Sequence, residues 1–228
     1  MRKYALCAAA MLTALVTPVF ADLVSSYVVS GRNADGSSYD GKITFTPAGQ
    51  VYRLDYCCVQ QSGFAIEYQN FLALAEIDSG GSGNLVIYKR SGNAWAGVFS
   101  QYNDSSLGVE ALYNGSAPDL PDAGRARSGN PAGKYRISGT NPDGSTYAGE
   151  VEVTPWAHAF DVDRTIGNAE TTGTAVSFDG ALAMNVANDG DRATPGVLGL
   201  FIRDGNGFLG IWAKAGSQRI GAERWVRK

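Results

Sequence analysis

The most constraining feature of this chain is an internal duplication. The segment that begins at Tyr27 reads YVVSGRNADGSSYDGKITFTP, and the segment that begins at Tyr135 reads YRISGTNPDGSTYAGEVEVTP. Shorter matches continue to the end of each half, such as WAGVF at 95–99 against FLGIW at 208–212. A repeat of roughly 90 residues is within the size range of an independent domain. We therefore expect two similar domains, each able to fold alone.

Residues 1–21 have the pattern of a secretory signal peptide. Arg2 and Lys3 give a positive start, an apolar run too short to span a bilayer follows, and Ala21 is a small residue at a suitable cleavage point. No later segment is apolar for long enough to cross a membrane as a helix. We therefore expect an exported protein, periplasmic or secreted, with no membrane span.

The rest of the chain divides into two halves and the segment that connects them. The halves are residues 22–114 and 134–228. The connecting segment, 115–133, contains three prolines together with several glycines and alanines. Such a composition sustains neither a helix nor a central strand. This segment is therefore expected to be a linker.

Each half consists of short runs in which apolar and polar residues alternate with the period of a β-strand, such as YDGKITF at 39–45. The motif Asn-x-Asp-Gly-Ser, at 33–37 and again at 141–145, predicts a hairpin turn, because Asp-Gly accommodates positive φ angles. About eight such runs fit into each half. Eight short strands at this spacing are typical of an up-and-down barrel or a compact sandwich, and we predict an all-β protein made of two tandem antiparallel barrels, each of about eight strands.

Each run is expected to turn one face toward its barrel and the other toward water. By this pattern Phe64, Ile66 and Tyr68 are assigned to the interior, and Ala65 and Glu67 to the wet face. An eight-stranded barrel is just wide enough to be filled by its own side chains or to hold one small ligand. The sequence leaves both outcomes open.

The charge balance excludes some classes of partner. Without Arg2 and Lys3, 17 of the 19 basic residues remain against 22 acidic residues, a net charge of −5. Neither half is basic enough to grip a phosphate backbone, so we expect no nucleic-acid partner. A polybasic patch for a membrane surface is also missing from the sequence.

Cys57 and Cys58 are adjacent, and they are the cysteines that remain after residues 1–21. Neighbouring residues on a strand point to opposite faces, which makes an ordinary disulfide between them awkward, whereas an exported setting favours oxidation. Three states are open: a strained ring, a disulfide to another chain, or two thiols. The second repeat has Thr165 and Ile166 near this place, so the pair does not belong to the repeated framework. We expect a monomer.

Residues that could carry catalysis or bind a metal are few. The chain has one histidine, His158, and a zinc site needs several His or Cys ligands. The Asp-Gly loops lack the carboxylate spacing of a calcium site, and no nucleophile–base pair is supported by spacing. We therefore predict no metal, no cofactor and no catalytic residue. Glu110 and Glu223, on the last run of each half, are interpreted as structural partners of an arginine such as Arg53.

Aromatic residues at matched positions are the best candidates for a binding site. Inside a barrel they would form either packed core or an aromatic wall around a ligand. Trp156 and Trp225 have no tryptophan counterpart in the first half, and they are candidates for an interface between the halves or with a partner. The candidate binding residues are Tyr39, Trp95, Phe99, Tyr147, Phe208, Trp212, Trp156 and Trp225.

Three strings resemble a family of small exported bacterial proteins: GTNPDGSTYAG at 139–149, GIW at 210–212 and GAER at 221–224. Proteins of this family are commonly labelled fibronectin-binding or hypothetical, and the resemblance is stronger in the second half. Members often carry separated cysteines, whereas this chain has Cys57 beside Cys58. The expected strand count is also similar to that of avidin-like and lipocalin-like barrels, by architecture alone.

Together these observations favour an exported, non-catalytic binding protein that recognises a protein partner or a small apolar ligand. An inhibitor of an extracellular hydrolase belongs to the same class, since small rigid barrels present loops well. The rival interpretation is an enzyme that uses the barrel interior, with an acid such as Asp55, Glu67 or Glu76 as base, and a purely structural role in the cell envelope is a third. A filled or hollow interior would distinguish these functions.

Overall fold

The computed structural model describes residue 23 and residues 26–57, 61–78, 83–102, 104–124, 129–188 and 195–228. Residues 1–21 lie outside this part of the chain, so the signal peptide stays a prediction. No helix in the described ranges is long and apolar enough to cross a membrane.

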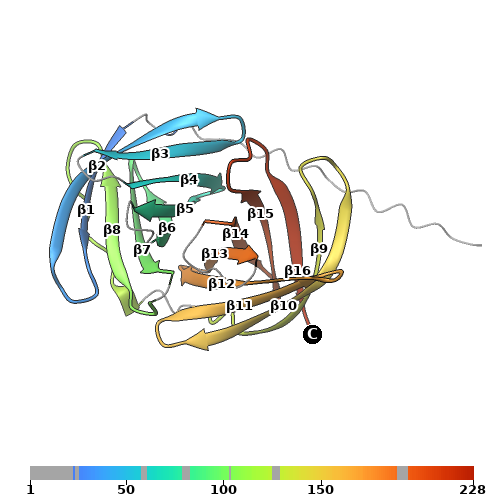
Figure 1. The fold of residues 1–228 in the computed structure, drawn as a ribbon. Coiled ribbons are helices and arrows are strands. Elements are labelled where there is room, and N and C mark those ends of the chain that lie inside the picture. Colours follow the sequence, from blue (N-terminus) through green and yellow to red (C-terminus); the bar gives the residue numbers. More distant parts are fainter. Residues whose placement is uncertain are drawn as a thin grey trace, which may run out of the picture.

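The described chain forms two closed antiparallel barrels that lie side by side (Figure 1). The first barrel closes where β8 pairs with β1, and the second closes where β16 pairs with β9. The prediction of two tandem eight-stranded barrels is confirmed. The strands of the first barrel are β1 (Ser26–Arg32), β2 (Ser38–Ala48), β3 (Val51–Cys57), β4 (Gln61–Tyr68), β5 (Phe71–Asp78), β6 (Gly83–Ser91), β7 (Ala94–Gln101) and β8 (Gly108–Tyr113). Those of the second are β9 (Gly133–Thr140), β10 (Thr146–Trp156), β11 (Ala159–Ile166), β12 (Ala169–Phe178), β13 (Ala181–Asn188), β14 (Val197–Asp204), β15 (Gly207–Lys214) and β16 (Gly221–Arg227).

The duplicated hairpin motif folds in the same way in both halves. Between β1 and β2 the Asp35 carboxylate accepts a hydrogen bond from the backbone N–H of Ser37 at 2.8 Å, and the equivalent bond between β9 and β10 is 2.9 Å. Gly36 and Gly144 have φ angles of 87° and 89°, which glycine adopts without strain. The predicted Asp-Gly turns are therefore confirmed.

Alternate residues of each strand face the two barrel interiors, where they form buried clusters. In the first barrel, Tyr27, Tyr52 and Trp95 come from the strand ends opposite the β1–β2 hairpin, and they belong to one buried cluster. Tyr135 and Trp225 belong to the equivalent cluster of the second barrel. This is the inward face that the period-2 pattern predicts.

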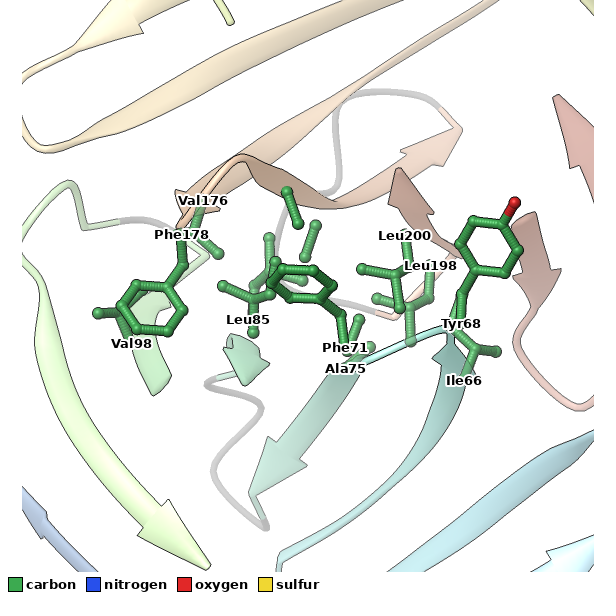
Figure 2. Close-up of a cluster of buried hydrophobic side chains, with 14 of the residues drawn as sticks. Ile66, Tyr68, Phe71, Ala75, Leu85, Val98, Val176, Phe178, Leu198 and Leu200 are labelled. Carbon is green, nitrogen blue, oxygen red and sulfur yellow. The ribbon is translucent and has the colours of Figure 1, made fainter. Parts of the chain in front are cut away.

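The outer faces of β4 to β7 pack against the outer faces of β12 to β15, and they form a third apolar cluster that we call the inter-barrel core (Figure 2). Phe64, Ile66 and Tyr68 belong to this cluster, while Ala65 faces the barrel interior and Glu67 is buried. The assignment of these residues to interior and wet faces is therefore wrong. Period-2 alternation separates the two faces of a strand, but it does not say which face meets a second sheet.

Polar contacts also cross between the barrels. The backbone N–H of Gln50 donates to the Gln218 carbonyl at 2.8 Å. The Thr174 hydroxyl donates to the Tyr102 carbonyl at 2.9 Å. Lys89 forms an ion pair with Asp179. These contacts fix the orientation that the apolar packing alone would leave adjustable.

The segment between β8 and β9 is attached to both barrels at its described ends. Leu120 and Ala123 pack against the inter-barrel core. Farther along, the Pro131 carbonyl accepts a hydrogen bond from the Tyr135 hydroxyl at 2.5 Å. These parts of the expected linker therefore contribute to packing as well as connecting the halves.

The inter-barrel core generates a prediction about the separated halves. Expressed alone, residues 22–114 and 115–228 should keep β-structure but self-associate and bind an apolar dye, because each exposes the face that the other covers. Mixed together, they should form a stable complex. Size-exclusion chromatography with light scattering measures both outcomes. Two halves that stay monomeric and do not bind each other when mixed would contradict the prediction.

Candidate functional site

In the first barrel, a tyrosine side chain of β2 lies over a glycine of β1, at the place where β1 pairs with β8 and closes the barrel. Gly31 in β1 lies opposite Tyr39 of β2 and opposite Glu110 of β8. The Tyr39 ring lies over Gly31 so closely that a Cβ atom there would overlap it. The Tyr39 hydroxyl donates a hydrogen bond to the Glu110 carboxylate at 2.5 Å. Because Gly31 has no side chain, the Tyr39 side chain of β2 can pass over β1 and contact Glu110 of β8.

The second barrel repeats this arrangement. The Tyr147 ring lies over Gly139, and its hydroxyl donates to Glu223 at 2.5 Å. A second aromatic ring covers a glycine in each barrel, and it packs edge to face with the tyrosine, at 6.2 Å between centroids in the first barrel and 6.3 Å in the second. We call this arrangement the mouth frame. It comprises Tyr39, Phe99 and Glu110 in the first barrel and Tyr147, Trp212 and Glu223 in the second.

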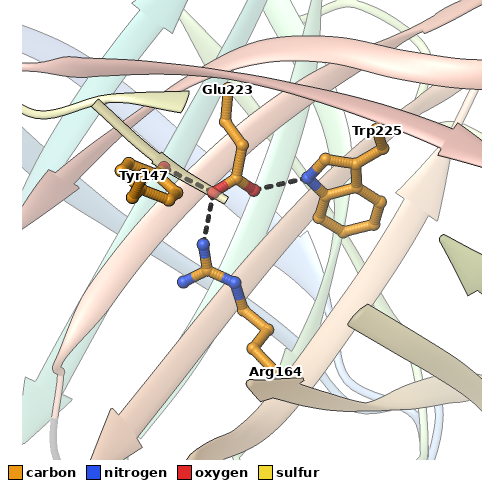
Figure 3. Close-up of polar contacts among 4 residues, drawn as sticks. All are labelled: Tyr147, Arg164, Glu223 and Trp225. Atoms are coloured by element: carbon orange, nitrogen blue, oxygen red, sulfur yellow. Dashed lines mark hydrogen bonds and ion pairs between the residues drawn. The ribbon is translucent and has the colours of Figure 1, made fainter. Parts of the chain in front are cut away.

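In the second barrel, the carboxylate of the mouth frame is neutralised by an arginine (Figure 3). Arg164 of β11 forms an ion pair with Glu223, and both side chains are buried. The indole Nε1 of Trp225 donates to the other oxygen of Glu223 at 2.5 Å. A buried charge needs both a counter-charge and hydrogen bonds, and the Glu223 carboxylate has both.

The first barrel lacks that counter-charge. Tyr56 occupies the place that Arg164 has in the duplication. Glu110 accepts hydrogen bonds from the hydroxyls of Tyr39 and Tyr88, and no Lys or Arg of the described residues forms an ion pair with it. Its carboxylate is therefore held by neutral donors alone.

A second buried carboxylate lies in the same barrel. Glu76 of β5 stands where the second barrel has Val186, since each is paired with the matching strand glycine. It accepts hydrogen bonds from the Tyr56 hydroxyl and, at 2.9 Å, from the amide of Gln61. The first barrel thus gains a carboxylate and loses an arginine relative to the second.

These residues line a cavity of about 470 Å³ at the hairpin end of the first barrel. Its lining combines the aromatic rings of Tyr39, Tyr56 and Phe99 with the carboxyl groups of Glu76 and Glu110. Two residues of the first barrel are smaller than their equivalents in the second barrel, which explains part of this space. Leu112 stands where the second barrel has Trp225, and Phe99 stands where it has Trp212.

A glycine also leaves the cavity open. Gly41 of β2 lines it, and a Cβ atom at that position would meet no atom within 4 Å. In the second barrel, a Cβ atom at the equivalent Gly149 would collide with the backbone of β11. Packing therefore requires glycine at position 149 but not at position 41, where its effect is to leave space.

Burial and mutual repulsion make the two glutamates unusual. Desolvation, followed by the charge of Glu110, raises the pKa of Glu76 from its usual 4.5 to about 8, against the opposing effect of hydrogen bonds from Tyr56 and Asn84. Desolvation also raises the pKa of Glu110, while hydrogen bonds from Tyr39 and Tyr88 lower it. Near neutral pH these effects favour one negative charge on the pair rather than two.

The acids proposed as catalytic bases are placed very differently. Asp55 is exposed on β3, and Glu67 is buried but does not line the cavity. Glu76 does line it. The cavity therefore has one of the three candidate bases, in a position where it could accept a proton or hydrogen-bond a ligand.

The six aromatic candidates at matched positions fall into three groups. Tyr39 and Phe99 line the cavity, and Tyr147 and Trp212 form the equivalent frame in the second barrel. The remaining matched residues are buried core, namely Trp95 and Phe208.

The unmatched tryptophans do not share one role. Trp225 lies inside the second barrel, 1% exposed, so its assignment to an interface is wrong. Its indole instead completes the hydrogen bonding of Glu223. Trp156 is half-buried at the end of β10.

Two further expectations concern the cysteines and the glutamates' partner. Cys57 is exposed at the end of β3 and lines the cavity, while Cys58 lies outside the described residues, so their redox state stays a prediction. An arginine does pair with Glu223, but it is Arg164, and Arg53 is exposed.

The matched glutamates were the part of this site that the sequence indicated. The sequence did not indicate Tyr56 or Tyr88, because these side chains come together with the glutamates only when the barrel closes.

The buried ion pair gives a stability prediction. Arg164→Met should destabilise the protein by about 3–5 kcal/mol, because it leaves Glu223 charged, buried and without a counter-ion. Adding Glu223→Gln should recover a large part of that loss. Urea unfolding of the two single variants and the double variant measures the coupling. An unchanged stability of Arg164→Met would contradict the assigned role.

The pKa of Glu76 gives a pH prediction. A carboxyl group whose pKa is raised by folding stabilises the folded state below its usual pKa of 4.5, and that contribution is lost as the pH rises through about 8. Glu76→Gln should therefore match the parent near about pH 4 and exceed its stability near about pH 9, by on the order of 2–4 kcal/mol. Urea midpoints measure the difference, with the exposed Glu170→Gln as control. A difference that does not change with pH would contradict the prediction.

Comparisons with known proteins give no family for this chain. No family model and no curated protein matches it. Among solved structures, one match is the "putative outer membrane protein" of Bacteroides fragilis, with 10% identity and a TM-score of only 0.27, over 89% of this chain and 96% of that one. The resemblance to fibronectin-binding proteins gains no support from these comparisons.

Proposed function

We propose that this chain is a non-catalytic binding protein that holds one small ligand in its first barrel. The observation that carries the proposal is the cavity of about 470 Å³, into which aromatic and polar side chains converge. Small-molecule sites are typically concave, about 300–1,000 Å³ in volume, and mostly apolar with a few placed polar groups. The cavity falls within this range of volumes, and it combines apolar ring surfaces with a larger share of polar groups than most such sites.

The lining favours a ligand with an apolar body and a polar end. Tyr39, Tyr56 and Phe99 offer ring surfaces to the body. Glu76 and Glu110 lie in the same lining and would lose hydration without compensation if the ligand were purely apolar. The expected apolar ligand is therefore refined to an amphiphilic one.

The second barrel packs against the strands that carry the proposed site. Strands β4 to β6 carry Gln61, Glu76 and Tyr88 on their inner faces, and their outer faces are buried in the inter-barrel core. Side chains on a strand that is packed on both faces have little freedom to move. A ligand therefore meets groups that are already in place, which reduces the ordering cost of binding.

A small ligand fits the described surface better than a protein partner. Val28 and Val226 are the exposed large hydrophobic residues among those described, and they lie on different barrels. Protein interfaces usually centre on a cluster of buried aromatic anchors. The signal-peptide pattern of residues 1–21 supports an exported location for this binding activity.

An enzyme is the second candidate, because Glu76 lies in the cavity with a raised pKa. A carboxyl group with a pKa near neutrality can exchange a proton with a substrate, as a general acid or a general base. The distinction is experimental: a binding protein returns the bound compound unchanged, whereas an enzyme converts it.

Gly41 offers a direct test of the cavity. Gly41→Phe should abolish binding of small aromatic probes, since its side chain would occupy the cavity, whereas Gly41→Ala should retain binding. Saturation-transfer NMR with a mixture of aromatic amines, amides, acids and alcohols measures binding, and the same spectra report any conversion. Thermal melts of both variants verify folding. Probe binding that survives Gly41→Phe would place the site elsewhere.

A further inference from the structure

In the second barrel, the glutamate of the mouth frame binds a cationic side chain of the same barrel. There the carboxylate of Glu223, with the Tyr147 hydroxyl on the same oxygen, holds the guanidinium of Arg164 (Figure 3). The cation is part of the chain and is buried. The duplication has thus built one copy of the frame around an organic cation.

The first barrel keeps the frame without the cation. Tyr39 and Glu110 form the same hydrogen bond, with the same length of 2.5 Å, over the equivalent glycine. Tyr56 replaces the arginine, and the cavity lies beside these groups. A carboxylate has about four lone-pair sites, and two hydroxyl donors leave capacity for a further donor.

We propose that the first barrel binds a small organic cation, an amidinium, guanidinium or ammonium group on a compact apolar body, with Glu110 holding it as Glu223 holds Arg164. This inference rests on the proposed function, because it names the ligand class of the same cavity.

The rest of the lining agrees with a cationic ligand. Glu76 adds a second carboxyl group that has no basic partner in the described chain. The rings of Tyr39, Tyr56 and Phe99 can face a cation through their π-systems. Lys42 is the one basic residue in the described lining, and it is exposed. An anionic ligand would therefore meet two buried carboxyl groups and no buried basic side chain among the described residues.

Three isosteric probes test the charge preference: benzamidinium, benzamide and benzoate. Isothermal titration calorimetry near neutral pH should show benzamidinium binding about tenfold or more tightly than benzamide, with benzoate weakest. Gly41→Phe should remove the binding of all three, which assigns the signal to the cavity.

Variants then test the residue that holds the cation. Glu110→Gln should weaken benzamidinium binding by about tenfold or more, a much larger loss than it causes for benzamide. Tyr56→Arg should also weaken benzamidinium binding more than benzamide binding, because it supplies from the chain the cation that Arg164 supplies in the second barrel. Glu170→Gln, on the exposed part of β12, is the matched control and should change neither. If Glu110→Gln fails to fold, Tyr56→Arg still decides the question.

The outcomes separate the two proposals. Benzamide or benzoate binding as tightly as benzamidinium, in a manner blocked by Gly41→Phe, overturns the cation inference and leaves the ligand-binding function standing. Benzamidinium binding that is indifferent to both Glu110→Gln and Tyr56→Arg also overturns it. If none of the three probes binds and the wider panel of aromatic amines, amides, acids and alcohols is also inert, both proposals fail.

Discussion

The hydrogen bond from a tyrosine to a glutamate across a bare glycine is the interaction on which the architecture depends. In each barrel it joins the second strand to the last at the seam where the barrel closes. It also buries a carboxylate at the barrel mouth, where its charge must be compensated. The same bond therefore contributes to closure and creates an electrostatic demand that each barrel meets in its own way.

The two barrels meet this demand differently, and the difference is chemical rather than topological. The second barrel uses Arg164 and Trp225, so its glutamate is neutralised and hydrogen-bonded within the chain. The first barrel uses tyrosine hydroxyls, adds Glu76 and leaves a cavity. A duplicated fold can thus neutralise the glutamate in one copy and leave a cavity beside it in the other. The inter-barrel core links the two barrels, because it packs against the outer faces of strands whose inner faces line the cavity.

Much of the fold could be predicted, whereas little of the site could. Alternation and Asp-Gly turns are local signals, so strand number, hairpins and barrel class followed from them. The same alternation misplaced Phe64, Ile66 and Tyr68, because a strand buried on both faces has two apolar environments and the pattern does not label them. Trp225 was misassigned because the sequence shows only that this tryptophan has no counterpart in the first half. In the structure its side chain fills space inside the second barrel.

By itself, the sequence determined the duplication, the all-β class, the Asp-Gly hairpins and the matched pairs of tyrosine and glutamate, since these depend on residues close together or on direct comparison of the halves. Only the tertiary structure decided which groups meet. Tyr39 and Glu110 are 71 residues apart, and Arg164 and Glu223 are 59 apart. Barrel closure brings such residues together inside a medium of low polarity, where an absent counter-charge has a consequence. The contrast between a neutralised glutamate and one held by tyrosines therefore emerges only when the barrels are closed.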